Sequence, residues 1–395
     1  MSPIKLPQHE SIHQYLKDQR FDLYFSKPVL RHMTHFLNGA TEKGFSGTLT
    51  DIHDLSYEAR HRTTLSHFLH KGVWKDSWLE GWILKQSITR IVKHSEQTGL
   101  PIYVLLDDSL MEKTKSSSRA THGIEGANFH FSHVKGKSVW GHNLVMLFLR
   151  CGNLRLPFAC RLYTKDGKSR IDLAKELIDL LPDFHLPAYL LMDTWYTCVP
   201  LLDAAAKKGL QVVGGLKTNR ILYPAGIRIP ANQFALHISQ SETHLVTVGD
   251  DAYHVYRYEG SLHDIPNAVV LFCWPKGKFG DPKSLRMFLS TDVAPSTESL
   301  IHHYSHRWAI ETFFQIMKSQ FSMDRYRIRH VSAIRRFLLL LLLTYLYCEQ
   351  AGHNHVSQGL SFLRNDRKQQ LIEWIYTQAQ EGIPLPEVKR SLCVA

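Results

Sequence analysis

The stretch "IYVLLDDS" at residues 102–109 is a short apolar run that ends in two acids. An apolar run of this length between polar flanks predicts a strand that is buried on both faces. The stretch "AYLLMD" at residues 188–193 repeats the pattern and ends at Asp193. A carboxylate at the end of a buried strand is costly unless it is paired or bound to a metal ion. The two stretches therefore predict a buried sheet that carries acids where its strands end.

The chain around these two stretches alternates between strand and helix patterns. Gly152-Asn153 is a hairpin turn signal, Pro182 stops a helical pattern and Gly209 closes another. The predicted order is strand, strand, strand, helix, strand, helix, strand, over residues 102–109, 139–151, 154–165, 170–182, 188–193, 199–209 and 210–217. If the first and fourth strands are neighbours in one sheet, Asp193 and one of Asp107 and Asp108 converge at one edge.

The segments on either side have a different character. Residues 1–98 read as helical and basic, which predicts a helical N-terminal domain that contacts DNA. Residues 220–294 contain hairpin and strand patterns and predict an all-β insertion. The polar tail after residue 350 has one amphipathic pattern around residues 367–380. The predicted organisation is therefore five segments, at residues 1–98, 99–219, 220–294, 295–350 and 351–395.

Composition favours a polyanionic partner. Lys and Arg outnumber Asp and Glu by 47 to 36, which gives a net charge of +11 and suits nucleic acid or an acidic membrane surface. The most apolar run, "FLLLLLLTYLYC" at 337–348, is shorter than the roughly 20 residues of a membrane helix, so it predicts a buried core helix. The six cysteines form no C-x-x-C pair, and the N-terminus has no signal-peptide pattern. We expect a reducing cytosol.

A second stretch, "HHYSHRWAIETFFQIMKSQF" at residues 302–321, places four polar residues on one helix face. Tyr304, Arg307, Glu311 and Lys318 lie at offsets 0, 3, 7 and 14 and would share an arc of about 60° on a continuous helix. The simplest interpretation is an i,i+4 ion pair between Arg307 and Glu311 on a solvated face. The alternative is that Glu311 joins the strand-end acids.

Three carboxylates gathered at one site would suit Mg²⁺ or Mn²⁺ better than zinc. Two such ions about 3.5–4 Å apart can activate water and stabilise the leaving oxygen of a phosphodiester. Each acid also has an ordinary structural explanation, since Asp107 and Asp108 can cap a turn and Asp193 can cap the following helix. The joint occurrence of the three acids in this strand order favours the metal site.

The strand order, the three acids and the spacing Tyr304-x2-Arg307-x3-Glu311-x6-Lys318 resemble DDE transposases of bacterial insertion sequences, in particular the insertion-sequence-four group with its Y-R-E-K signature. "DDSLMEK" also resembles the D-D-T…K segment of a sister group, with Lys113 in the place of its lysine. The resemblance implies an RNase H-like core that is interrupted by an insertion.

The same resemblance implies roles for individual residues. Asp107, Asp193 and Glu311 would be the catalytic acids that hold two Mg²⁺ or Mn²⁺ ions. Tyr304, Arg307 and Lys318 would contact DNA at the element ends. Asp107 keeps the D-x-Ser/Thr form with Ser109, and Asp108 remains the alternative first acid.

The activity implied by the resemblance is cut-and-paste transposition. The chain would bind terminal inverted repeats, cleave the element ends and transfer the strands to target DNA, as a homodimer in the nucleoid-associated cytoplasm of a prokaryote. Two alternatives stay open: a metal-dependent nuclease without strand transfer, and an inactive transposase-derived DNA-binding protein.

Three other features have a functional and a structural explanation. Trp274 lies in the insertion and either holds a flipped base or packs in the core. His302 and His306 either contact phosphate or are solvated. The basic connection at residues 116–143 either contacts DNA or is a solvated loop.

Overall fold

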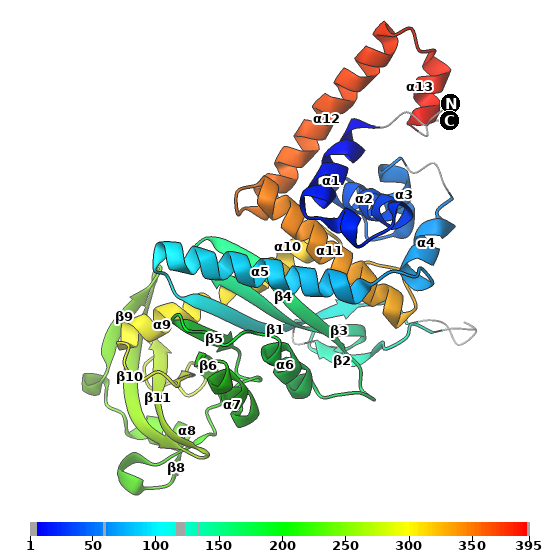
Figure 1. The fold of residues 1–395 in the computed structure, drawn as a ribbon. Coiled ribbons are helices and arrows are strands. Elements are labelled where there is room, and N and C mark those ends of the chain that lie inside the picture. The colour runs from blue at the N-terminus through cyan, green and yellow to red at the C-terminus, as the bar shows by residue number, and fades with distance from the viewer. Residues whose placement is uncertain (1–5, 58–60, 116–122, 133, 393–395) are drawn as a thin grey trace. The chain divides into compact units, whose positions relative to one another are not determined.

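The computed structural model describes residues 6–57, 61–115, 123–132 and 134–392 (Figure 1). Their backbone forms two compact units. Unit 1 contains residues 1–86, 109–144 and 313–395, and unit 2 contains residues 87–108 and 145–312. The unit boundaries fall inside helices and strands, so they cut across the five segments predicted from the sequence.

The central element of unit 2 is a sheet with both parallel and antiparallel strand pairs. Two parallel pairings join β1 to β5 and β5 to β6, and β12 then adds to β6 in the antiparallel direction. The hydrogen-bonded order is β3-β1-β5-β6-β12-β11-β10, and β4 pairs with β3. The bounds of five of these strands are β1 Ile102–Glu112, β3 Lys137–Cys151, β4 Leu154–Tyr163, β5 Ala188–Met192 and β6 Gln211–Leu216. The expectation that the first and fourth predicted strands are neighbours is confirmed.

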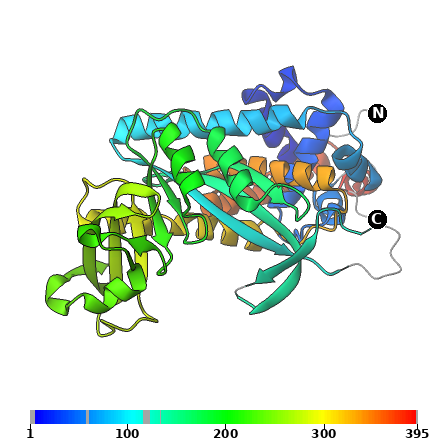
Figure 2. The same ribbon diagram turned by 90° about the horizontal axis from the view of Figure 1, so that it is seen from below.

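Helices in unit 2 begin and end where the sequence provides signals. Ser169 caps helix α6 (Arg170–Asp179) in a capping box with Asp172, and Ser296 caps α9 (Thr297–Ser305). Pro200 lies in the first turn of α7 (Val199–Lys207), where a missing N–H costs nothing. The helices α6 and α7, green in Figures 1 and 2, lie side by side along the sheet.

Residues 220–294 are not all-β. They form the strands β7 Ile221–Leu222, β8 Ile229–Pro230, β9 His244–Val248, β10 Asp251–Leu262, β11 Ile265–Pro275 and β12 Arg286–Ser290. They also contain the short helix α8 (Ala231–Phe234) and three 3-10 turns. Because β12 pairs with β6, the strands of this segment continue the sheet of unit 2. Trp274 is 1% exposed and its ring packs against Phe272 and Phe279, so it belongs to the core.

Unit 1 is mainly helical. No strand occurs among the described residues of the first 98, as the sequence predicted. One strand, β2 (Asn128–Ser132), pairs with the start of β3 and was not predicted. The basic connection expected over 116–143 therefore includes strand residues, and its residues 116–122 lie outside the described ranges. The remaining helices are α1 Pro7–Asp18, α2 Lys27–Thr41, α3 Leu49–Leu55, α4 Thr63–His70, α5 Asp76–Thr98, α10 Trp308–Ser319, α11 Val331–Ala351, α12 Val356–Gln380 and α13 Leu385–Ser391.

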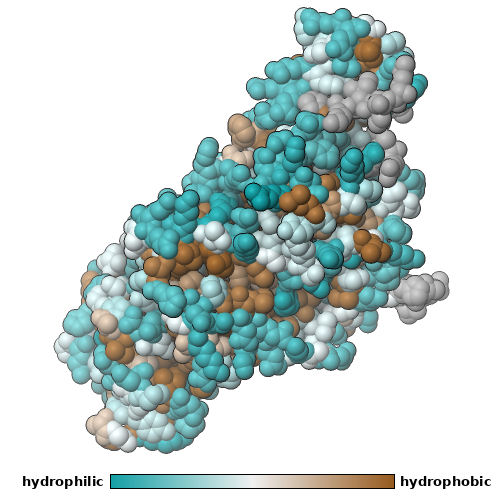
Figure 3. Space-filling model, viewed as in Figure 1, coloured by the Kyte–Doolittle hydropathy of each residue, from teal (hydrophilic) through white to brown (hydrophobic). Residues whose placement is uncertain are grey.

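Helix α11 is the core of unit 1. It is the one helix among the described residues that is long and apolar enough to cross a membrane, and 78% of its apolar window is buried inside the protein. Phe337 packs edge-on against Phe36 of α2, and every residue from Phe337 to Glu349 is buried. In Figure 3 the surface of the α12–α13 end of the unit is mainly hydrophilic. The prediction of a buried core helix is confirmed.

Leu340 in α11 provides a direct test of this packing. It is fully buried, so Leu340→Ala removes apolar contacts and leaves a cavity. We expect the free energy of unfolding in urea to fall by about 2–5 kcal/mol. The matched control is Ile372→Ala on α12, which is 67% exposed and should change stability by less than about 0.5 kcal/mol. Equal effects of the two substitutions would contradict the core assignment.

Candidate active site

The strand register brings two acids side by side. In the parallel pairing of β1 with β5, Leu106 lies opposite Met192; Asp107 is the next residue on β1, and Asp193 is the first residue after β5. Strand β1 continues to Glu112, so the prediction that this strand ends at its two acids is wrong, whereas Asp193 does follow the end of its strand. Neighbouring strands lie about 4.8 Å apart, so the two backbones hold the two acids side by side at the edge where β5 ends. The conditional prediction of converging acids is therefore confirmed for Asp107 and Asp193.

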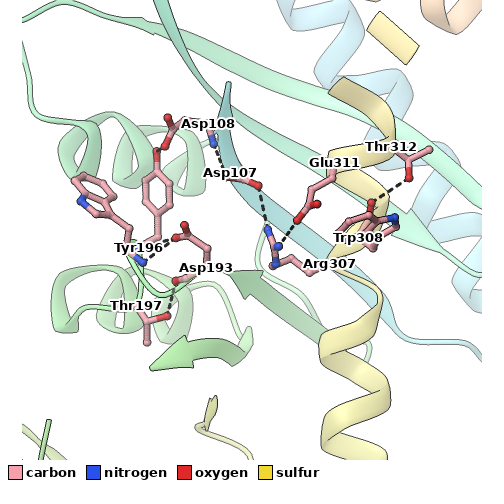
Figure 4. A network of polar contacts seen from close by, with 10 residues as sticks. Asp107, Asp108, Asp193, Tyr196, Thr197, Arg307, Trp308, Glu311 and Thr312 are labelled. Atoms are coloured by element: carbon pink, nitrogen blue, oxygen red, sulfur yellow. Dashed lines mark hydrogen bonds and ion pairs between the residues drawn. The ribbon is translucent and has the colours of Figure 1, made fainter. Parts of the chain in front are cut away.

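Arg307 connects Glu311 to this edge (Figure 4). Its Nη1 donates to Asp107 Oδ2 at 3.0 Å, and its Nη2 donates to Glu311 Oε1. The i,i+4 ion pair expected from the sequence is therefore present, and it extends to a second acid 200 residues away in the chain. All these groups belong to unit 2.

The stretch 302–321 is not one helix. Helix α9 ends at Ser305, α10 begins at Trp308, and Arg307 lies in the turn between them. Within this turn the N–H of Arg307 bonds to the carbonyl of Tyr304, and the N–H of Ile310 bonds to the carbonyl of Arg307. The single arc predicted for the four polar residues therefore holds only for Glu311 and Lys318, which share α10.

The charge balance of the site favours an added cation. Burial raises the pKa of Asp107 to about 7; the nearby Arg307 guanidinium lowers it, while the charge of Asp193 raises it further. Burial would lower the pKa of Arg307, but its neighbours Tyr304, Asp107 and Glu311 raise it overall. One guanidinium thus compensates a group of carboxylates whose negative charges repel one another.

Asp193 also stabilises the turn before α7. Its Oδ1 accepts the backbone N–H groups of Trp195 and Tyr196 at 2.9 and 3.0 Å, which fixes the turn before α7. Its Oδ2 accepts no hydrogen bond from the residues that the structure describes. The capping explanation therefore accounts for one oxygen of Asp193, and the other remains available to a ligand.

Asp108 points away from Asp107, because successive side chains of a strand alternate between faces. It accepts a hydrogen bond from the Tyr196 hydroxyl at 2.9 Å and an ion pair from Arg170 at 3.2 Å. Burial and the charge of Asp108 raise the pKa of Tyr196 well above its usual value. Among the two adjacent acids, Asp107 is the one that shares Arg307 with Glu311.

Tyr304 and Lys318 already have protein partners. The ring of Tyr304 packs against Phe288 with centroids 4.5 Å apart, and the guanidinium carbon of Arg307 lies 5.8 Å from the centroid of the Tyr304 ring. Lys318 donates from Nζ to the carbonyl of Leu110 at 3.0 Å within unit 1, and burial lowers its pKa. His303 bonds to the hydroxyl of Tyr103, while the rings of His302 and His306 meet edge to face.

Sequence reasoning missed the partners of Asp108. Arg170 also stacks on Trp195, with its guanidinium carbon 4.3 Å from the ring centroid. The pair "WY" at residues 195–196, one residue beyond Asp193-Thr194, was the available signal, since aromatic residues are unusual in a tight turn. No local signal marks Arg170, which is brought in from the start of α6.

The side chains around Arg307 are candidate ligands for a metal ion. Among the described residues, no group of three or more His, Cys, Asp or Glu side chains is arranged to hold a metal ion. The guanidinium of Arg307 bonds to two of the three predicted ligands, Asp107 and Glu311. The donor set of three carboxylates nevertheless fits a hard divalent cation, whose charge would offset the burial and the charge of Asp193 that raise the pKa of Asp107.

Comparisons with known proteins give one match and one negative result. A protein-family model described as transposase DDE domain matches residues 101–347, which is more than half of the 395 residues. No curated protein matches the chain.

Proposed function

Because the chain belongs to the family of the transposase DDE domain, we propose that it is a cut-and-paste transposase of a bacterial insertion sequence. It binds the terminal inverted repeats, cleaves the element ends and joins the freed strands to target DNA. The observation that carries this proposal is the meeting of Asp107, Asp193 and Glu311 around Arg307 in unit 2. The strand order supports an RNase H-like core, and the Y-R-E-K spacing supports the insertion-sequence-four group.

Asp107, Asp193 and Glu311 would hold two Mg²⁺ or Mn²⁺ ions. Bound metal ions supply an activated water and stabilise the leaving oxygen of the phosphodiester. The protein's own share is positioning, since the register of β1 and β5 fixes two ligands before any DNA binds. The hydrogen bonds from Trp195 and Tyr196 hold Asp193 in one orientation.

Arg307 has two uses in this proposal. Its guanidinium neutralises Asp107 and Glu311 and keeps both half-buried carboxylates paired. This planar group suits a phosphate as well as a carboxylate, so Arg307 could also contact the DNA backbone. Tyr304 lies against it and limits where the guanidinium can go.

The proposed partners are the DNA at the element ends and a second copy of this chain. The helical N-terminal segment and Lys318 contact the end DNA, and a homodimer brings two ends together. A prokaryotic cytoplasm, next to the nucleoid, is the proposed location. The net charge of +11 supports a DNA partner.

A second candidate function is a DNA-binding protein that has lost catalysis. The observation that favours it is the ion pairing of Arg307 with two of the three proposed metal ligands. Such a protein binds end DNA but leaves it intact in both Mg²⁺ and Mn²⁺. A nuclease without strand transfer is distinguished by the absence of a joined product.

Glu311→Gln tests the catalytic role directly. The amide keeps the shape and can still accept a hydrogen bond from Arg307, but it cannot neutralise a metal ion. We expect metal-dependent cleavage of DNA that carries the gene and its flanks to fall at least about 100-fold, with DNA binding nearly unchanged. Cleavage products resolved on a sequencing gel, beside a gel-shift assay, measure both.

The matched control for this variant is Glu298→Gln on α9, whose carboxylate is outside the site and only caps that helix. It should cleave as the wild type does. If Glu311→Gln cleaves at the wild-type rate, Glu311 is not a metal ligand and the proposed mechanism fails.

Asp107→Asn and Asp108→Asn separate the two adjacent acids. Asp107→Asn should lose at least about 100-fold in cleavage, because it removes a proposed ligand. Asp108→Asn should retain most of its activity but lose about 1–3 kcal/mol of stability, because Arg170 and Tyr196 lose their charged partner. Initial cleavage rates and urea midpoints measured on both variants decide between them. The reverse pattern would make Asp108 the first catalytic acid.

A further inference from the structure

Unit 1 contains a cavity of about 790 Å³ that the proposed active site does not use. Its walls are the start of α3, the start of α4 and the segment that leads into α11. The volume falls in the range of ordinary ligand sites. Three arginines and two histidines line it, together with five hydroxyl side chains and a single acid. No Phe, Tyr or Trp is among the described residues that line it.

One wall is the segment "RYRIRH" at residues 325–330. Exposed and buried residues alternate along it: Arg325, Arg327 and Arg329 are exposed, whereas Tyr326 is buried. Neither Arg325 nor Arg327 forms an ion pair with a residue that the structure describes. The segment therefore presents a row of guanidinium groups to solvent, and Arg327 and Arg329 line the cavity.

Hydrogen bonds from Lys113, His142 and Glu125 hold this wall in place. Lys113 donates from Nζ to the carbonyls of Asp324 and Tyr326, and its ammonium lies 3.3 Å from the centroid of the Tyr326 ring. The hydroxyl of Tyr326 bonds to His142 Nδ1 at 2.7 Å. The side chain of Glu125 bonds to His330 and to the N–H of Val331. The row of arginines is thus preorganised, which lowers the entropic cost of binding a ligand.

The opposite wall supplies hydroxyl groups and one more cation. Exposed Arg62, directly before α4, donates to the hydroxyl of Thr50 on α3 at 3.1 Å. The one acid, Asp51, accepts hydrogen bonds from the N–H and the hydroxyl of Ser46, and its own N–H donates to Thr48 Oγ1. Burial raises the pKa of Asp51, but hydrogen bonds with Ser46 and Thr48 lower it overall. The carboxylate of Asp51 therefore already has hydrogen-bond partners at the start of α3. The cations of both walls remain in excess.

We propose that this arginine groove binds the sugar–phosphate backbone of double-stranded DNA. Guanidinium, imidazole and hydroxyl donors are the groups that contact phosphate oxygens without reading sequence. The lack of an aromatic platform argues against a site for a nucleotide base. The inference rests on the proposed function, to which it adds a phosphate-binding surface separate from Tyr304, Arg307 and Lys318. The groove positions the duplex, and the chemistry occurs at the acids of unit 2.

The test is the salt dependence of DNA binding by the full chain. Each phosphate contact contributes about 0.9 to the slope of log K against log salt concentration. Arg62→Ala combined with Arg327→Ala, one substitution on each wall, should reduce the slope by about 2. The charge-preserving pair Arg62→Lys and Arg327→Lys should restore the slope. Fluorescence anisotropy with a labelled duplex measures it, and a thermal melt checks that each variant is folded.

The matched control is Lys389→Ala with Arg390→Ala on α13, which removes the same charge from exposed positions of unit 1 outside the groove. Its slope should equal that of the wild type. If both double variants lower the slope equally, the effect is one of net charge and the groove proposal is overturned. An unchanged slope in the groove variant overturns it as well.

Competition experiments identify the source of the phosphate. ATP or inorganic phosphate at millimolar concentration should not displace the duplex from the wild type, and duplex RNA should compete less well than DNA. Displacement by ATP or phosphate would make the groove a small-anion site, and stronger competition by RNA would make RNA the partner. Cleavage of DNA is assayed in the same preparation. If the protein cleaves DNA but the groove variant leaves the salt slope unchanged, only the groove proposal is wrong. If the groove variant reduces the salt slope but the protein does not cleave DNA, only the proposed transposase function is wrong.

Discussion

The half-buried contact of Arg307 with Asp107 and Glu311 is the constraint on which the active site depends. Carboxylates from β1 and α10, together with Asp193 after β5, lie close together at the edge of a sheet whose strands are otherwise apolar. Without a cation among them, their mutual repulsion and desolvation would favour protonation, and the pKa of Asp107 already lies near 7. The arginine permits the strands and the helix to pack before a metal ion is present.

This interaction also explains why two adjacent acids can have different tasks. Strand geometry sends Asp107 toward Arg307 and Asp108 toward Arg170 and Tyr196. Each acid therefore has its own arginine, and the two networks lie on opposite faces of β1. The network around Asp107 has carboxylates that can bind a ligand. The network around Asp108 links β1 to the start of α6 and to the turn after Asp193.

In unit 1, too, different residues serve the packing of the core and the proposed binding of DNA. Helix α11 supplies the apolar core, while the segment before it carries exposed arginines on a backbone that Lys113 and His142 hold through buried contacts. Lys113, which resembles the lysine of a sister group's D-D-T…K segment, thus has a structural use. Its ammonium binds two main-chain carbonyls and an aromatic face.

The sequence by itself determined the order of the strands and helices from β3 to β6, the buried nature of α11 and the neighbouring positions of two acids, one on β1 and one after β5. These features depend on local periodicity and on polar residues that follow apolar runs, which can be recognised without knowing the fold. Tertiary structure alone decided that the stretch 302–321 breaks at Arg307, that Asp107 and Asp108 divide their partners, and that the arginines of 325–330 face a cavity. Each of these depends on side chains that are distant in the chain, such as Arg170 and Lys113, and pairings of that kind have no local sequence signal.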